Sequence, residues 1–300
     1  MELRTLKYFL TVAKEENISK AANVLHLTQP TLSRQLMDLE NELGIKLFIR
    51  GNRKVQLTDE GKLLCKRAEE IMTLVDKTEQ ELNHSDTIIN GDIYIGGGET
   101  DAIRLIAKTA QHLQRKYPNI KYHIFSGNTD DVTERLDKGL LDFGILIEPT
   151  DLTKYEHLQI PTTDTWGLLM RKDSNLASKQ TITPKDLKHI PLIISRQSLV
   201  DETISNWLEE SSKNLNIIAT YNLIFNASLM VEEGMGYALC LDKLVNTTGD
   251  CELCFIPLSP PLESKLNIVW KKNQVLSKAS KKFLQALKND FSLMTNHQKS

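Results

Sequence analysis

The segment Ser19 to Arg50, SKAANVLHLTQPTLSRQLMDLENELGIKLFIR, constrains the fold of this chain more than any other. Leucines at positions 32, 36, 39 and 43 have the 4-3-4 spacing that predicts a helix with one buried face. Because a helix turns by about 100° per residue, Arg34 falls almost opposite these leucines. The exposed side then carries small polar groups and one guanidinium at its N-terminal end. Such a surface is suited to the major groove of DNA.

Two helices and a tight turn are predicted before the helix that carries these leucines. Residues 3–16 place apolar side chains on one face, and residues 18–25 form a second helix that ends in the turn His26-Leu27. Thr28 is a suitable N-cap, and a proline fits the first turn of the following helix. We therefore expect a helix from about residue 29 to 43, terminated by Gly44.

A basic hairpin is predicted next, with strands at 46–50 and 54–57 around the turn 51–53. The net charge of the chain is only −2, so contact with DNA needs a local basic patch. The window 46–54 supplies Lys46, Arg50, Arg53 and Lys54 without an acid. Taken alone, this window is better explained as a solvated hairpin tip. After a pair of helices, a β-wing that meets phosphates is the preferred interpretation.

A long helix is predicted from Thr58, which acts as a cap ahead of two acidic residues. Apolar or small residues repeat along it at 4-3-4-3-4 spacing, at Leu64, Ala68, Ile71, Val75, Thr78 and Leu82. This heptad pattern is typical of a helix that pairs with a copy of itself. The alternative is an amphipathic helix packed on its own domain. Residues 84–90 lack periodicity and are predicted to be a hinge.

From residue 91 onward, strands and helices alternate, which predicts a parallel sheet with helices on both faces. Strands are expected at 92–96, 120–125, 141–147, 167–170, 192–195, 217–221, 237–241, 253–256 and 266–270. Helices are expected after residue 100 and at 129–138, 183 onward, 202–211, 226–233 and 278–288, with a frayed tail at 295–300.

Several classes of protein are disfavoured by the sequence. No apolar run approaches the roughly 18 residues of a membrane span, and no signal peptide is recognisable, so the cytoplasm is the expected compartment. Cys251-x-x-Cys254 has no second pair that would complete a metal site, and packing is the preferred role for both thiols. No nucleophile elbow, paired catalytic carboxylates or metal cluster is recognisable, so we expect no enzyme and no cofactor.

The N-terminal residues match a known signature closely. They are Ser19, Ala21-Ala22, Leu25, Thr28-Gln29-Pro30-Thr31-Leu32-Ser33, Gln35, Leu39-Glu40, Leu43-Gly44, Leu47-Phe48, Arg50, Leu57-Thr58 and Gly61. This pattern resembles the N-terminal signature of LysR-type transcriptional regulators. Two less specific segments, 139–145 and 233–237, resemble landmarks of the C-terminal domain of that family.

The resemblance implies an α/β multidomain protein. Its parts would be a winged helix-turn-helix at 1–58, a linker and dimerisation helix with a hinge at 59–90, and an effector-binding domain at 91–300. That domain would resemble periplasmic binding proteins, with lobe I at about 91–161 and 268–300 and lobe II at about 162–267. The family also implies a homodimer or homotetramer that binds interrupted inverted repeats of double-stranded DNA in promoter regions, with RNA polymerase as a candidate partner.

On this basis we expect DNA contacts from one set of residues and pairing of two copies from another. The DNA-binding candidates are Thr28, Gln29, Pro30, Thr31, Ser33, Arg34, Gln35, Arg50, Arg53 and Lys54. The dimerisation candidates are Leu64, Ala68, Ile71, Val75 and Leu82.

The effector is expected between the lobes, at the C-terminal ends of strands, where loops expose helix N-termini. Hydroxyls, free N–H groups and Arg196 in these loops would favour a small carboxylate or similar anion. The candidates are Gly97, Gly98, Thr100, Gly127, Asn128, Ser195, Arg196, Gln197 and Asn226. The alternative role for each is a tight turn or a helix cap. A ligand-binding protein without DNA function is the alternative for the whole chain, but it leaves the basic hairpin and the heptad pattern unexplained.

Overall fold

The computed structural model describes residues 1–51, 54–82, 89–200, 203–208 and 215–297. The chain divides into two compact units, residues 1–83 and 84–300. Among the described helices, none combines the length and the apolar composition that crossing a membrane requires.

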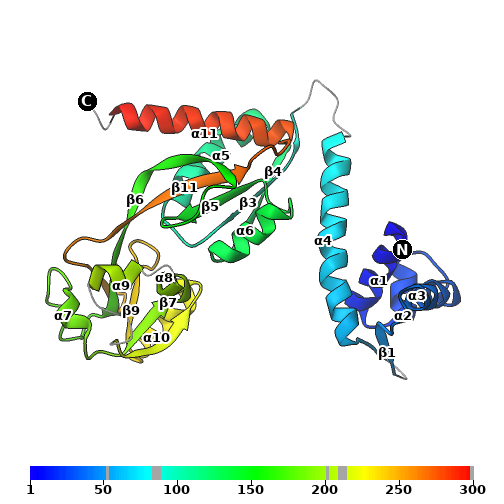
Figure 1. The fold of residues 1–300 in the computed structure, drawn as a ribbon, viewed down its shortest axis with the longest axis horizontal. Coiled ribbons are helices and arrows are strands. Elements are labelled where there is room, and N and C mark those ends of the chain that lie inside the picture. Colours follow the sequence, from blue (N-terminus) through cyan, green and yellow to red (C-terminus); the bar gives the residue numbers. More distant parts are fainter. Residues whose placement is uncertain (52–53, 83–88, 201–202, 209–214, 298–300) are drawn as a thin grey trace. The chain divides into compact units, whose positions relative to one another are not determined.

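The N-terminal unit is a three-helix arrangement followed by a small hairpin and one long helix (Figure 1). Its elements are α1 (Leu3–Glu15), α2 (Ile18–Val24), α3 (Gln29–Leu43), β1 (Phe48–Arg50), β2 (Val55–Leu57) and α4 (Asp59–Leu82). The predicted end points of α3 are confirmed, because Thr28 is its N-cap and Gly44 ends it in a left-handed conformation at φ 68°. A glycine adopts this conformation at little cost.

One core holds this unit together. Phe9 of α1, Leu32, Leu36 and Leu39 of α3, and Leu47 ahead of β1 are at most 1% exposed. The fourth leucine of the predicted stripe, at position 43, is 38% exposed, because it lies in the last turn of α3 beyond the reach of the core.

The glycine at position 61 shows how closely α4 approaches the hairpin. A Cβ atom there would lie 2.2 Å from the backbone oxygen of Leu47, which is far inside contact distance. Any larger residue would push the start of α4 away from the core. This close approach gives a physical reason for a glycine at this position of the signature.

The first half of the C-terminal unit is a parallel sheet, as predicted. Strand β3 (Gly91–Gly97) pairs in parallel with β4 (Ile120–Ser126) and with β5 (Phe143–Ile147). Helices α5 (Ile103–Lys116) and α6 (Thr129–Asp137) connect them.

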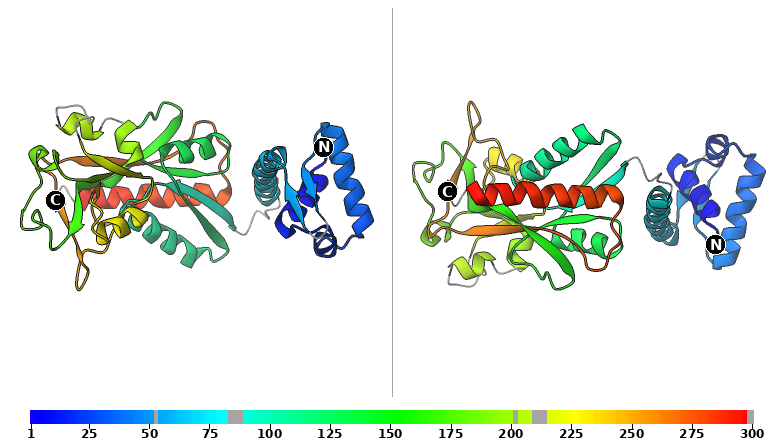
Figure 2. Two further views of the ribbon diagram at one scale, coloured as in Figure 1. Left: turned by 90° about the horizontal axis from the view of Figure 1, so that it is seen from below. Right: turned by 90° about the horizontal axis from the view of Figure 1, so that it is seen from above.

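Helices cover both faces of this sheet. Helices α5 and α11 pack on one face around Phe143 and Phe283, and α6 packs on the other through Val132 and Leu136. Figure 2 shows α11 lying along this part of the molecule.

The chain-end helix is longer than predicted. Helix α11 runs from Lys278 to His297, whereas the sequence predicts its end near residue 288 and a frayed tail from 295. Phe291 is only 3% exposed in the same core as Phe283, so packing extends the helix beyond the predicted end.

Two long antiparallel strands run through both halves of the unit. Strand β6 (Tyr155–Arg171) pairs through its first part with β11 (Glu263–Lys271) and through its last part with β9 and β10. The sequence predicts only 167–170 of β6. Residues 155–166 include a proline and many polar side chains, so their strand conformation depends on pairing with β11 and is not visible as local alternation.

The second half of the unit is a sheet with helices on both faces. Its elements are α7 (Pro184–Leu187), β7 (Leu192–Ser195), α8 (Arg196–Val200), α9 (Thr203–Leu208), β8 (Ile217–Tyr221), α10 (Ile224–Glu232), β9 (Tyr237–Leu241) and β10 (Leu253–Pro257). Strand β7 pairs in parallel with β8 and β9. Helix α10 covers one face, and α7 and α9 cover the other. The predicted helix 202–211 lies partly outside the described residues, as does the predicted hinge at 84–90, of which only 89 and 90 are described.

Candidate DNA-binding helix and candidate effector pocket

The N-terminal half of α3 offers a polar exposed surface above a closed core. Thr28, Gln29, Pro30, Thr31 and Arg34 are exposed, and two further candidates, at positions 33 and 35, are half-buried. The Thr28 hydroxyl accepts a hydrogen bond from the N–H of Thr31 (3.4 Å) and contacts its hydroxyl (2.8 Å). The cap therefore fixes the first turn, and its candidates are accessible at the N-terminal end of the helix.

A buried carboxylate fixes α3 to the hairpin. Glu40 is 3% exposed, and its Oε1 accepts hydrogen bonds from the N–H groups of Leu47 (2.8 Å) and Phe48 (3.2 Å). Lys46 pairs with the other oxygen at 3.2 Å. Burial alone raises the pKa of the Glu40 carboxyl, but these two N–H groups and the Lys46 ammonium together lower it below its ordinary value.

This contact changes the interpretation of the basic window. Lys46, one of its four bases, is engaged by Glu40 of the same unit. Sequence reasoning misses the role of Glu40, although one signal is present. Glu40 lies on the buried face of α3, four residues after Leu36 and next to Leu39, where an acid without a partner would be costly.

The hairpin itself is shorter than predicted, with β1 and β2 antiparallel and Phe48 opposite Leu57. Lys54 is exposed, and its Nζ lies 3.5 Å from a carboxylate oxygen of Glu16. Arg50 is the last residue of β1. Arg53 lies outside the described residues.

Helix α4 uses the first part of its heptad pattern inside its own unit. Ala68 is fully buried, and Leu64 and Ile71 pack half-buried against the core around Phe9 and Leu36. Ala68 can therefore reach a second copy only if this core opens. For these three candidates the structure corresponds to the alternative of a helix packed on its own domain.

The later part of α4 differs. Leu82 is 79% exposed and Leu74 is 37% exposed, while Val75 is half-buried. Leu63, near the start of α4, is also exposed, at 61%, so accessible apolar side chains lie near both ends of this helix.

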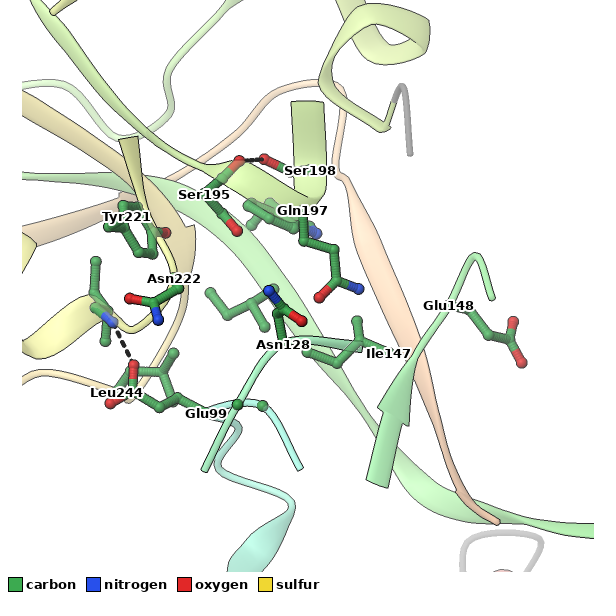
Figure 3. A pocket seen from close by; sticks show the side chains of 15 residues that line it. Glu99, Asn128, Ile147, Glu148, Ser195, Gln197, Ser198, Tyr221, Asn222 and Leu244 are labelled. Carbon is green, nitrogen blue, oxygen red and sulfur yellow. Dashed lines mark hydrogen bonds between the residues drawn. The ribbon is translucent and has the colours of Figure 1, made fainter. Parts of the chain in front are cut away.

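A pocket opens in the C-terminal unit where parallel strands of both halves end (Figure 3). It has a volume of about 70 Å³. It is lined by Gly98, Glu99, Gly127, Asn128, Ile147, Glu148, Trp166, Ser195, Gln197, Ser198, Tyr221, Asn222, Ile224, Leu241 and Leu244. Because a ligand here would touch segments from both halves, the pocket lies where the sequence predicts a cleft.

Five of the nine predicted effector residues line this pocket, namely Gly98, Gly127, Asn128, Ser195 and Gln197. Gly97 and Thr100 instead line a second pocket of about 460 Å³ beside α5, which also includes Glu99 and Lys243.

Two predicted effector residues lie outside the lining of both pockets. Arg196 is exposed as the first residue of α8, and Asn226 lies in the first turn of α10, where Ile224 takes the place next to the pocket. The basic group on which an anionic ligand was expected to depend is therefore not in the pocket wall.

Sequence reasoning misses several lining residues. Tyr221 is the last residue of β8 and Asn222 follows it, and this end-of-strand position is a signal that could have found them. Trp166 offers no such signal, because it lies within β6 and reaches the pocket only through the pairing of that strand.

Hydrogen bonds cross the pocket between distant segments. Gln197 donates from Nε2 to the hydroxyl of Thr129 (2.5 Å), and its Oε1 accepts from the N–H of Thr129 (3.1 Å). The N–H of Ile224, at the start of α10, donates to the carboxylate of Glu99 (Figure 3). These contacts connect loops that are about 70 to 125 residues apart in the chain.

A buried acid contacts Thr100 of the second pocket. Asp164 of β6 is 2% exposed and accepts a hydrogen bond from the Thr100 hydroxyl (2.5 Å). Burial raises the pKa of this carboxyl to about 6, with a smaller lowering by the Thr100 hydroxyl and a further raising by Asp242.

The cysteines form no pair. Cys251 lies just before β10 and its thiol contacts the backbone oxygen of Asn246 (2.9 Å), while the thiol of Cys254, within β10, lies 3.9 Å from the backbone oxygen of Arg171. Burial raises the pKa of Cys254. Within the described part of the chain, no three His, Cys, Asp or Glu residues are grouped as metal ligands would be.

Comparisons with known proteins identify the family. A protein-family model described as "Bacterial regulatory helix-turn-helix protein, lysR family" matches residues 3–62. A second family model, described as "LysR substrate binding domain", matches residues 89–292. The chain belongs to the LysR family of transcriptional regulators. It is therefore a DNA-binding regulator of transcription with a C-terminal effector-binding domain, and the family resemblance and fold class predicted from the sequence are confirmed.

Individual relatives extend over most of the chain. The uncharacterized HTH-type transcriptional regulator YvbU of Bacillus subtilis is 31% identical over 240 residues, which are 80% of this chain and 81% of that protein. The Hca operon transcriptional activator HcaR of Escherichia coli is 26% identical over 281 residues, 92% of this chain and 93% of that one.

A solved structure shares the fold. Full-length CbnR complexed with its target DNA is similar with a TM-score of 0.75 and 19% identity, covering 97% of this chain and all of that one. LysR regulators bind DNA and oligomerise.

Proposed function

We propose that this regulator recognises its operator through the exposed N-terminal half of α3. The observation that carries the proposal is the exposed N-terminal end of α3, where residues 28–31 and Arg34 are accessible and the leucines at 32, 36 and 39 are buried. In the major groove, the hydroxyls and N–H groups of the first turn suit phosphates, and Arg34 and Gln35 suit base edges.

The hairpin supplies charge next to this helix. We assign Arg50, Arg53 and Lys54 to contacts with phosphates, which raise affinity for all sequences alike. Since Lys46 is paired with Glu40, its role is to hold the hairpin against α3.

Two copies of the chain would bind the two halves of an interrupted inverted repeat in a promoter. The accessible apolar side chains toward the end of α4, Leu74 and Leu82, support pairing through that helix. Dimers could associate further into tetramers, and RNA polymerase is the expected partner at the promoter. We place this function in the cytoplasm.

The pocket between the two halves of the C-terminal unit is the proposed effector site. We assign the two halves to the lobes expected at about 91–161 with 268–300 and at about 162–267, and the pairing of the long strands β6 and β11 supports this assignment. A ligand that contacts both halves has different affinities for open and closed arrangements, and can therefore shift the regulator between two states.

The test is a DNA-binding titration with the chain's own upstream DNA and with single-base variants of the bound site. Replacing Arg34 by alanine should weaken the cognate site by about 1–3 kcal/mol and relax the preference at one base pair. Arg53→Ala should weaken all sites alike and reduce the salt dependence.

The control is Arg67→Ala, which removes an exposed arginine of α4 that pairs with Glu70. This variant should bind as the parent does. An Arg34→Ala protein with unchanged sequence preference would contradict the role assigned to that residue. A parent protein that binds none of its upstream DNA would contradict the proposal as a whole.

A further inference from the structure

One carboxylate faces the pocket without a cation beside it. Glu99 lies in the loop between β3 and α5, lines the pocket and reaches across to α10, where it accepts the N–H of Ile224 (Figure 3). Among the described residues, the carboxylate of Glu99 accepts a hydrogen bond from this N–H group, through one of its two oxygens. The other oxygen retains its capacity to accept a hydrogen bond from a ligand.

The remaining lining supplies no positive charge. Among the described residues around this pocket there is no lysine, arginine or histidine. Lys243, which lines the second pocket together with Glu99, is paired with Asp242 at 3.1 Å. The other lining acid, Glu148, is held by the side-chain amide of Asn267 (2.7 Å), and Figure 3 shows its carboxylate turned away from the labelled residues around the pocket.

The neutral groups set the size and polarity of a ligand. Trp166, Leu241 and Leu244 provide apolar walls, and a pocket of about 70 Å³ suits a small molecule. Amides at Asn128 and Asn222 add hydrogen-bonding capacity that carries no charge. A site of this kind favours the binding of a small, mostly apolar molecule with one cationic end, and it disfavours an anion.

We propose that the effector of this regulator is a small primary amine whose ammonium group binds the carboxylate of Glu99. The proposal rests on the function proposed above, namely that this pocket is the effector site. A cationic ligand takes the place of the anionic ligand that the sequence predicts, because Arg196 lies outside the pocket wall and Glu99 lies within it. By bonding both Glu99 from one half and the groups around Asn222 from the other, the amine stabilises the closed arrangement.

A rival explanation gives Glu99 the opposite role. A carboxylate at the start of α10 is favoured by the helix dipole, so Glu99 could occupy the position of an anionic effector in the ligand-free protein. In that case removal of its charge would help an acid to bind. The two explanations therefore predict opposite responses to the same substitution.

The experiment uses n-butylamine, butanamide and butanoate as probes, since they share one carbon skeleton and differ in charge. Binding to the full-length chain at pH 7 is measured by calorimetry and by the rise in the unfolding midpoint Tm. Glu99→Gln is the test variant, because a glutamine oxygen still accepts the Ile224 N–H and the fold keeps this contact. Glu156→Gln, an exposed acid on β6 outside the pocket, is the matched control.

The amine should bind more tightly than the amide and the acid. Its affinity should fall about tenfold or more in Glu99→Gln and stay unchanged in Glu156→Gln, since a hydrogen bond to a charged group is lost only in the former. Tighter binding of butanoate, strengthened by Glu99→Gln, overturns the proposal in favour of the rival. An amine that does not bind, or that binds the Glu99→Gln protein equally well, also overturns it.

The failure of this inference can be distinguished from failure of the proposed function. Operator binding by the same protein samples tests the DNA-binding role without any probe. If DNA binding persists and butanamide or butanoate binds in place of the amine, with an affinity that Glu99→Gln changes, the pocket is the effector site and only the ligand class is wrong. If DNA binding persists and none of the three probes binds, the effector site proposed above is contradicted as well.

Discussion

The two units of this regulator build their binding surfaces in different ways. In the N-terminal unit, the residues proposed to contact bases lie within residues 28–35, on one helix. In the C-terminal unit, the pocket combines segments near residues 98, 127, 147, 166, 196, 222 and 242, which meet only after the sheets have formed. A surface made from one helix is defined by local spacing, whereas a surface made from many loops is defined by the tertiary fold.

Buried acids show the same contrast in energetic terms. Glu40 in the N-terminal unit is satisfied by two backbone N–H groups and a lysine, and its pKa is lowered. Asp164 in the C-terminal unit receives one hydroxyl, and burial raises its pKa to about 6. Glu40 therefore stabilises its unit when it is charged, whereas a charged Asp164 destabilises the folded state of its unit.

The largest expected effect comes from the core behind α3. Leu36→Ala should cost about 2–5 kcal/mol of stability in the N-terminal unit, because it leaves a cavity at a position that is 1% exposed. DNA binding and the hydrogen-exchange protection of residues 29–43 should fall together.

The C-terminal unit provides the internal reference for this variant. All three tryptophans, at positions 166, 207 and 270, lie there, so denaturant unfolding followed by tryptophan fluorescence should be unchanged. Leu3→Ala, which truncates a leucine that is 48% exposed, is the control. A shift of the fluorescence transition in Leu36→Ala would contradict the independence of the two units.

An intermediate effect is expected from the buried acid Asp164. Because the pKa of Asp164 is about 6 in the folded protein and about 3.9 in an unfolded chain, folding favours its protonated form. Its contribution to stability is fully present below the unfolded pKa and is lost as the pH rises through 6. The C-terminal unit should gain up to about 3 kcal/mol from this group between pH 8 and pH 4.

This gain should be absent in Asp164→Asn, in which the side chain carries no charge at any pH. Fluorescence-detected unfolding in denaturant across this pH range provides the measurement. Asp250→Asn, at an exposed position, should keep the parent pH dependence. Identical pH profiles for the parent and Asp164→Asn would show that Asp164 does not titrate in this range.

The smallest of the three effects has the opposite pH dependence. Glu40→Gln retains one acceptor for the N–H groups of Leu47 and Phe48 but loses the charge, and should cost about 1–2 kcal/mol at pH 7. Since the folded pKa of Glu40 is lowered, its contribution is present above the unfolded pKa and is lost as the pH falls through the lower folded value.

The difference between parent and variant should therefore shrink between pH 5 and pH 3. Hydrogen exchange in residues 29–57, corrected for the intrinsic rate at each pH, gives the local stability. Asp38→Asn, two residues away on the exposed side of α3, should have little effect. A difference that grows toward low pH would show that Glu40 is not held in the charged form.

The heptad pattern of α4 marks a limit of inference from spacing. Leu64, Ala68 and Ile71 satisfy the repeat, yet they pack on the core of their own unit. A 3.5-residue period describes a buried helical face and does not state which surface buries it. Exposure in the folded unit separates Leu82, which is accessible, from Ala68, which is not.

The sequence by itself determined the proposed DNA-binding helix of the N-terminal unit and the order of elements in the sheets. Helix α3, its cap at Thr28 and its end at Gly44 follow from periodicity and backbone preferences that act within a few residues. The parallel arrangement of β3, β4 and β5 follows from alternating strands and helices.

Only the tertiary structure decided how the pocket is charged. Arg196 and Gln197 are neighbours in the chain, yet Gln197 lines the pocket and Arg196 does not. Glu99 becomes a pocket carboxylate because the start of α10, far along the chain, is brought against it. Burial and long-range pairing set the charge of a site, and neither is encoded in the spacing of neighbouring residues.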